Sequence, residues 1–213
     1  LGIYGGSFDP IHLGPLLPVE EARAATGLDE IVYVPAFAPP HKPLGPSASA
    51  FHRFAMCALA VEAYPHLLIS DFEVSRGGTT YTIETLRHVR ANHPESEVFL
   101  VLGSDSMAGL ANWREWREIV ANHRIVVVYR EGVDYPSLRE TLPPELSSRL
   151  APLGARPHDE VAESQTIFWA GNAPVTISST WIRSALPSVQ SLSESLPPAV
   201  ERFARLHRLY VAP

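Results

Sequence analysis

The sequence contains one cysteine, Cys57, among 213 residues. A single cysteine excludes an intramolecular disulfide and a zinc site built from cysteines, and it is typical of proteins from a reducing compartment. No apolar run approaches the roughly 20 residues that a membrane-spanning helix needs, and the first residues show no charged-then-apolar leader. We therefore expect a cytoplasmic protein with no membrane partner.

Basic residues are also few: 17 Lys and Arg stand against 23 Asp and Glu, which gives a net charge of −6. This balance argues against a nucleic-acid partner, which a basic face would bind. A small anionic ligand is compatible with this net charge, because a local nest of backbone amides can hold a phosphate in an acidic protein. Lys42 is the only lysine. It is either a remnant of compositional drift toward arginine or a functional residue, and its stiff setting in Pro39-Pro40-His41-Lys42-Pro43 favours function.

Short β-rich runs alternate along the chain with longer helical stretches. The predicted strands are Leu1–Tyr4, Ile31–Pro35, Leu67–Phe72, Val98–Leu102, Arg124–Val128 and Thr166–Trp169. The predicted helices are about Leu16–Thr26, Ala50–Ala63, Tyr81–Asn92, Trp113–Asn122 and Pro136–Leu150. This alternation is typical of βαβ units, and consecutive apolar residues are typical of strands covered on both faces. We predict an α/β fold with a doubly wound, Rossmann-like parallel sheet, whose ligands bind at the carboxyl ends of the strands.

No linker or internal repeat marks a second domain, so we predict one domain over residues 1–213. After Asn172 the pattern changes, and a small helical portion over about 177–213 is expected to cap the same sheet. Ser179 or Thr180 is the expected N-cap of its first helix, because a hydroxyl accepts a first-turn amide. The sequence does not indicate the oligomeric state.

The loop after the first predicted strand reads Gly5-Gly6-Ser7-Phe8-Asp9-Pro10-Ile11-His12-Leu13-Gly14-Pro15. Two glycines after a buried strand let the backbone approach a ligand closely, and the following helix start offers unpaired amides to an anion. His12 stands where its ring can reach a phosphate. A tight structural turn could use the same glycines, so both interpretations stay open. The spacing matches neither the P-loop nor the dinucleotide fingerprint.

Two other segments occupy similar strand-to-helix positions. In Gly103-Ser104-Asp105, Asp105 either accepts bonds from ribose hydroxyls or only caps the next helix. In Ile177-Ser178-Ser179-Thr180, the hydroxyls either cap a helix or join an anion site to which Arg183, one turn on, adds charge. Trp113 and Trp116 are three apart on one predicted helical face, and core packing explains one of them.

The glycine-rich loop resembles the N-terminal signature of nucleotidylyltransferases that carry a HIGH-type His-x-Gly-His motif. Within that group the chain resembles the bacterial nicotinate-mononucleotide adenylyltransferases, over nearly its whole length and in order. The segments that carry the resemblance are Gly5–Gly14, Pro35 with Pro39-Pro40-His41-Lys42, Thr80-Tyr81-Thr82 with Thr85-Leu86, Gly103-Ser104-Asp105 with Trp113, and Ile177–Thr180 with Ile182-Arg183. Each is weak alone; five in register are strong.

The resemblance implies adenylyl transfer from ATP to nicotinate mononucleotide, with Mg²⁺ assisting. The residues that it implies for catalysis are His12, Lys42 and Arg183. Those implied for ATP binding are Gly5, Gly6, Ser7, Phe8, His12, Gly103, Asp105, Ser179, Thr180 and Arg183. Those implied for the acceptor are Lys42, Thr80, Tyr81, Thr82, Trp113 and Arg130, with Trp113 stacked on the pyridine ring. Phosphopantetheine as the acceptor is an alternative, and no single residue decides between nicotinate and nicotinamide.

One departure from the family pattern concerns the second histidine of the motif, whose position here holds Pro15. Proline is well tolerated at a first helical position, because a backbone N–H there would have no partner within the helix and its absence costs nothing. It cannot donate to a phosphate, however, and losing one such donor typically costs about 10²–10³ in rate. The enzyme is then slow, or another group such as His41 substitutes, or the chain binds nucleotide without turning it over.

Overall fold

The computed structural model describes residues 1–40, 45–130, 132–153, 166–173, 175–188 and 191–211. Its strands are β1 (Gly2–Gly6), β2 (Ile31–Pro35), β3 (Leu67–Ile69), β4 (Phe99–Gly103), β5 (Arg124–Val128), β6 (Leu150–Pro152) and β7 (Ile167–Trp169). Its first helices are α1 (Leu13–Thr26), α2 (Ala50–Val61), α3 (Phe72–Arg76), α4 (Thr82–Asn92) and α5 (Ser104–Ala108). The others are the 3₁₀ helix η1 (Leu110–Asn112), α6 (Trp116–Asn122), α7 (Tyr135–Thr141), α8 (Pro144–Ser147), α9 (Ser179–Ala185) and α10 (Pro198–Leu206). Among the described residues, no helix is long and apolar enough to cross a bilayer.

The strands form one sheet in the hydrogen-bonded order β3-β2-β1-β4-β5-β7-β6. The pairs β1–β4, β4–β5, β5–β7 and β6–β7 are parallel. Chain order runs outward in one direction from β1 to β3 and in the other from β4 to β5, as in doubly wound sheets, and β7 then lies between β5 and the edge strand β6. The predicted α/β, Rossmann-like fold class is therefore confirmed.

Contacts divide the chain into two compact units that are interleaved along the sequence. Unit 1 comprises Leu1–Tyr4, Pro18–Ile31 and Tyr81–Val175. Unit 2 comprises Gly5–Leu17, Val32–Thr80 and Thr176–Pro213. The assignment of residues 1–213 to one domain stays a prediction.

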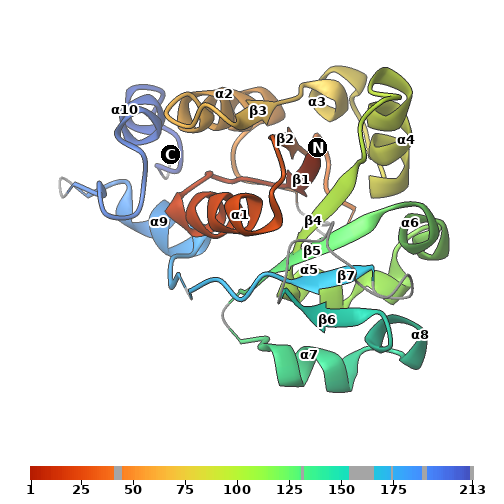
Figure 1. The fold of residues 1–213 in the computed structure, drawn as a ribbon. Coiled ribbons are helices and arrows are strands. Elements are labelled where there is room, and N and C mark those ends of the chain that lie inside the picture. The colour runs from red at the N-terminus through yellow and green to blue at the C-terminus, as the bar shows by residue number, and fades with distance from the viewer. Residues whose placement is uncertain (41–44, 131, 154–165, 174, 189–190, 212–213) are drawn as a thin grey trace. The chain divides into compact units, whose positions relative to one another are not determined.

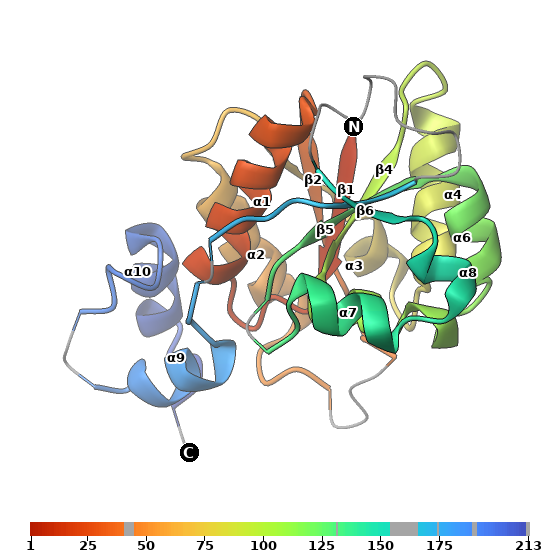
Figure 2. The same cartoon turned by 60° about the horizontal axis from the view of Figure 1, so that its bottom comes forward.

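The core of unit 1 is built on β4 and β5. Every residue of β4 is buried, and Ile125, Val126 and Val127 of β5 are 0% exposed. Such runs suit strands that are covered on both faces, and each buried aliphatic side chain contributes about 1.5–3 kcal/mol. Helices α4 and α6 pack side by side in this unit (Figures 1 and 2).

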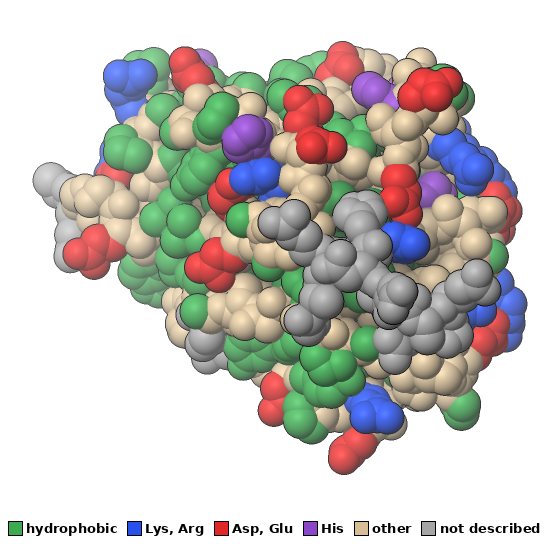
Figure 3. Space-filling view, in the orientation of Figure 1, with side chains coloured by type: hydrophobic (Ala, Val, Ile, Leu, Met, Phe, Trp, Pro, Cys, Tyr) green, Lys and Arg blue, Asp and Glu red, His purple; other side chains and the backbone are tan. Residues whose placement is uncertain are grey.

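The core of unit 2 forms where α10 packs on α2 (Figure 1). The buried stripe of α2 includes Ala50, Arg53, Met56 and Ala60, spaced three or four residues apart as expected for one helical face. Hydrophobic side chains reach the surface over α10 and α2 (Figure 3). One of them is Phe51 of α2, which is 66% exposed. The α2 stripe thus places one arginine where apolar residues are the rule.

Several predicted boundaries were wrong for identifiable reasons. The predicted helix Pro136–Leu150 is divided into α7, α8 and β6, because Pro143-Pro144 cannot continue a helix. The predicted strand Leu67–Phe72 ends at Ile69, and Phe72 begins α3. The predicted helix start at Leu16 lies at Leu13, so Pro15 is the third residue of α1 rather than the first.

Candidate active site

The loop after β1 turns at Phe8, whose φ of 47° is in the left-handed region. This residue is 8% exposed, and its ring lies 5.6 Å, centroid to centroid, from the Tyr33 ring. A Cβ on Gly6 would lie 2.9 Å from the Phe8 ring, so this position has no room for a side chain. Gly5 is under no such constraint. The loop shape therefore depends on Gly6 and Phe8 together.

His12 is 2% exposed and folds back over the start of α1. Its Nδ1 accepts the Gly14 amide at 3.1 Å, so in the neutral ring the proton is on Nε2, which is then the donor. A Cβ on Gly14 would lie 2.6 Å from the imidazole Cε1. The glycine of the His-x-Gly motif is therefore needed, because it leaves room for the histidine ring and orients it through its amide.

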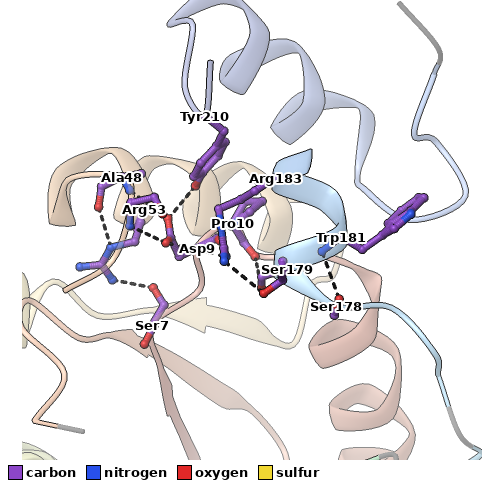
Figure 4. Close-up of polar contacts among 12 residues, drawn as sticks. Ser7, Asp9, Pro10, Ala48, Arg53, Ser178, Ser179, Trp181, Arg183 and Tyr210 are labelled. Carbon is purple, nitrogen blue, oxygen red and sulfur yellow. Dashed lines mark hydrogen bonds and ion pairs between the residues drawn. The ribbon is translucent and has the colours of Figure 1, made fainter. Parts of the chain in front are cut away.

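Asp9 fixes the middle of the loop and is 4% exposed. Its carboxylate accepts the Ser47 amide at 2.7 Å, the Ala48 amide at 3.0 Å and the Tyr210 hydroxyl at 2.9 Å (Figure 4). Charge-assisted bonds of this kind are about twice as strong as neutral ones. The loop is thereby tied to the residues before α2 and to the C-terminal segment.

Arg53 supports the same loop from α2 and is 0% exposed. Burial lowers the pKa of its guanidinium and the Asp9 charge opposes this, but arginine stays protonated in proteins. Its nitrogens donate to four backbone carbonyls, those of Ser7, Ala36, Phe37 and Ala48. A buried positive charge therefore lies directly behind the loop.

Helix α9 brings a second cation to this loop (Figure 4). Arg183 Nη1 donates to the Asp9 carbonyl at 2.8 Å, and Nη2 donates to the Thr180 hydroxyl at 3.1 Å. Ser179 Oγ donates to the Pro10 carbonyl at 3.2 Å. The N-cap is Ser178, not Ser179 or Thr180, because Ser178 accepts the Trp181 amide. The structure thus brings the first loop and α9 together within unit 2.

In unit 1, Gly103 ends β4 and Asp105 lies in the first turn of α5. The N-cap of α5 is Gly103, and no side chain makes a capping hydrogen bond there. Asp105 is therefore not the N-cap residue of this helix. Its carboxylate is exposed. A Cβ on Gly103 would collide with this carboxylate and lie 2.8 Å from Cγ of Arg130. The geometry places Gly103, Asp105 and Arg130 side by side.

The predicted acceptor residues are divided between the units. Thr80 in unit 2 is 6% exposed, and its hydroxyl has no hydrogen-bond partner among the described residues. Tyr81 in unit 1 precedes α4, which begins at Thr82, and its ring lies 4.9 Å below the Arg114 guanidinium. Trp113 follows η1 and is half-buried. It is not on the α6 face with Trp116, because α6 begins only at Trp116.

Two of the singled-out residues, Lys42 and His41, lie outside the described residues. Sequence reasoning assigned no role to Asp9, Arg53 or Tyr210. Only Arg53 gave a signal that could have been used, because it occupies an apolar stripe position of a predicted helix.

A sequence model of the family described as cytidylyltransferase-like matches residues 3–185. The chain belongs to the cytidylyltransferase-like family. A probable nicotinate-nucleotide adenylyltransferase of Citrifermentans bemidjiense is 36% identical over 99% of this chain and 98% of its own length. One of Aeromonas hydrophila is also 36% identical, over 99% and 96%. These matches confirm the resemblance predicted from the sequence.

A solved structure also resembles this cytidylyltransferase-like chain. It is the Plasmodium falciparum nicotinic acid mononucleotide adenylyltransferase complexed with NaAD, with a TM-score of 0.71 and 19% identity. The match covers 98% of this chain and 96% of the Plasmodium chain. At that identity, the likeness shows the shared fold.

Proposed function

We propose that the protein is a nicotinate-nucleotide adenylyltransferase of NAD biosynthesis. A phosphate oxygen of nicotinate mononucleotide attacks the α-phosphorus of ATP. The bond from that phosphorus to the bridging oxygen breaks, and pyrophosphate leaves as nicotinate adenine dinucleotide forms. The observation that carries the proposal is a pair of donors at the loop after β1: His12, whose ring accepts the Gly14 amide, and Arg183 of α9, which donates to the Asp9 carbonyl. Because the reaction consumes ATP, we place it in the cytoplasm.

Adenylyl transfer requires in-line placement of the reactants and donors aimed at the developing negative charge. We assign the triphosphate to the backbone of Gly5, Gly6, Ser7 and Phe8, to His12 Nε2–H, and to Arg183 with its neighbours Ser179 and Thr180. Fixed donors of this kind are worth about 3–4 kcal/mol each in the transition state. The resemblance adds Lys42 as a further point charge.

The adenosine ribose is assigned to Gly103 and Asp105. Vicinal hydroxyls are donors, and a carboxylate accepts two of them. The exposure of Asp105 at the carboxyl end of β4 supports this assignment. Arg130, adjacent to Gly103, is assigned a phosphate contact.

The pyridine ring of the acceptor is assigned to Trp113, and its carboxylate to Thr80, Tyr81 and Thr82. The unpartnered hydroxyl of Thr80 supports this assignment, because a buried donor without a partner costs about 1–3 kcal/mol that a ligand can recover. Neutral donors around a carboxylate favour nicotinate over nicotinamide mononucleotide.

Among the described residues, no group of three or more His, Cys, Asp or Glu could hold a metal ion. The Asp9 carboxylate accepts three protein donors, so it does not suit Mg²⁺. We propose that Mg²⁺ enters with ATP, since this ion commonly binds through substrate phosphates and water. The steps above do not depend on a protein-held metal.

Pro15 motivates a second candidate, a nucleotide-binding protein without turnover. Its ring lacks both the donor and the charge of the histidine in the family motif. Pyrophosphate release with ATP and Mg²⁺ tests both candidates when nicotinate mononucleotide, nicotinamide mononucleotide and phosphopantetheine are compared as acceptors. We expect the nicotinate form to give the highest kcat/KM. Pyrophosphate release with phosphopantetheine as the only active acceptor would contradict the assigned acceptor. ATP binding without pyrophosphate release in the presence of any of the three acceptors would favour the second candidate.

A further inference from the structure

Tyr210 approaches the phosphate loop from the far end of the chain. Its hydroxyl donates to Asp9 Oδ1 at 2.9 Å across 201 residues of sequence (Figure 4). Burial, and then the Asp9 charge, raise the pKa of this phenol well above its usual value, so it remains a donor at neutral pH. The contact is therefore a fixed bond between the C-terminal segment and the loop.

The backbone around Tyr210 is shaped to make this contact. Arg208 and Tyr210 have φ values of 50° and 65°, which non-glycine residues seldom adopt and which cost about 1–3 kcal/mol each. The Leu209 amide donates to the Ala204 carbonyl at 2.9 Å and closes the turn after α10. Strained residues persist where the surrounding structure determines them, and here the turn directs the phenol toward Asp9.

Arg183 lies on the other side of the same carboxylate. Its Nη1 is 2.8 Å from the Asp9 carbonyl oxygen but 4.0 Å from Asp9 Oδ2. The guanidinium is thus held by a neutral carbonyl and not paired in a close fork with the carboxylate, which leaves its charge available to an anion. Arginine and carboxylate groups pair readily in that fork geometry.

We propose that Tyr210 is a positioning residue that keeps Arg183 available to the triphosphate, an inference that rests on the proposed function. By donating to Oδ1, the phenol satisfies and orients the Asp9 carboxylate together with the Ser47 and Ala48 amides. Without this donor, the carboxylate draws the Arg183 guanidinium into a close ion pair. The cation is then turned away from the phosphates and partly neutralised.

The test compares Tyr210→Phe with Tyr64→Phe as the matched control. Tyr64 is half-buried in the same unit, and its hydroxyl has no bonded partner in the described part of the chain. We expect Tyr210→Phe to weaken ATP binding about tenfold, the scale of one bond to a charged group. We expect kcat to fall while the KM for nicotinate mononucleotide stays unchanged. Tyr64→Phe should resemble the wild type.

A double-mutant comparison separates positioning from general stability. In an Arg183→Ala background, Tyr210→Phe should have no further effect on ATP binding, because the group it positions is gone. Titrations well below the melting temperature of the least stable variant keep all proteins folded. Wild-type ATP affinity in Tyr210→Phe, or a full additional loss in the Arg183→Ala background, overturns the inference and leaves the proposed function standing. A wild-type protein that neither binds ATP nor releases pyrophosphate overturns both.

Discussion

Replacing Pro15 with histidine should increase turnover, and the structure shows that the fold can accept the change. Pro15 is the third residue of α1, where the amide of any residue lacks an intrahelical partner. The substitution therefore restores an N–H without breaking a bond. The Pro15 carbonyl accepts the Tyr33 hydroxyl at 3.2 Å, and this backbone contact does not depend on the side chain.

The expected magnitude follows from two opposing effects. A correctly placed donor to the transferred phosphate contributes about 10²–10³ in rate, or roughly 3–4 kcal/mol. The larger side chain enters a buried position, which costs about 1–3 kcal/mol of folding stability through overpacking. ATP affinity should change little, because His12, Arg183 and the loop amides stay in place. We therefore expect a higher kcat, a lower melting temperature and a nearly constant KM for ATP.

Steady-state pyrophosphate release measures the effect, with Pro15→Ala as the matched control. Alanine restores the amide N–H but supplies no side-chain donor, so its turnover should stay at the wild-type level. A folded Pro15→His protein with wild-type turnover would refute the donor argument. An equal gain in Pro15→Ala would assign the effect to the backbone.

Three further predictions test the supports of the site and the pH dependence of folding. Gly14→Ala should lower kcat at least tenfold and also lower the melting temperature, because a Cβ displaces the buried His12 ring and would lie 3.1 Å from the Ile177 carbonyl oxygen. Arg53→Met should lower the free energy of unfolding in urea by about 3 kcal/mol or more, since four backbone carbonyls, buried or partly buried, lose their donor. Arg202→Met, at an exposed position of α10, should change it by less than about 0.5 kcal/mol. Burial lowers the pKa of His123 below 6.5 in the folded protein. As the pH drops below about 7, the unfolded chain therefore binds this proton more readily than the folded protein does, and the free energy of unfolding should fall. Urea unfolding of His123→Gln should show a weaker dependence, and an identical pH profile would contradict the assignment.

Sequence patterns located the buried strands well because local chemistry determines them. The strands Ile31–Pro35 and Arg124–Val128 have the predicted bounds, since each is a short β-branched run that polar residues or a proline delimit. The short strand Leu150–Pro152 was missed. Its three residues carry no period of their own, and its pairing with Ile167–Trp169 is a long-range contact.

The candidate site was predictable only as far as the loops that carry it. Glycines at the carboxyl ends of β1 and β4 indicated where ligands bind, because strand ends in such sheets are the usual sites. The contacts that hold the loop were not predictable. Asp9 is bonded to Ser47, Ala48 and Tyr210, at separations of 38 to 201 residues, and no local pattern encodes such distances.

Gly14 and Pro15, the last two positions of the motif region, are constrained for different physical reasons. The difference bears on whether the protein is a slow enzyme or only binds nucleotide. Gly14 must be small because the His12 ring occupies the space beside it, so its identity is part of the loop shape. Position 15 contributes only a helical φ and a carbonyl to that shape, and proline supplies both. A substitution there removes a donor and leaves the anion-binding geometry intact. The loop should therefore still hold a triphosphate in a reactive position, which favours slow adenylyl transfer over binding alone.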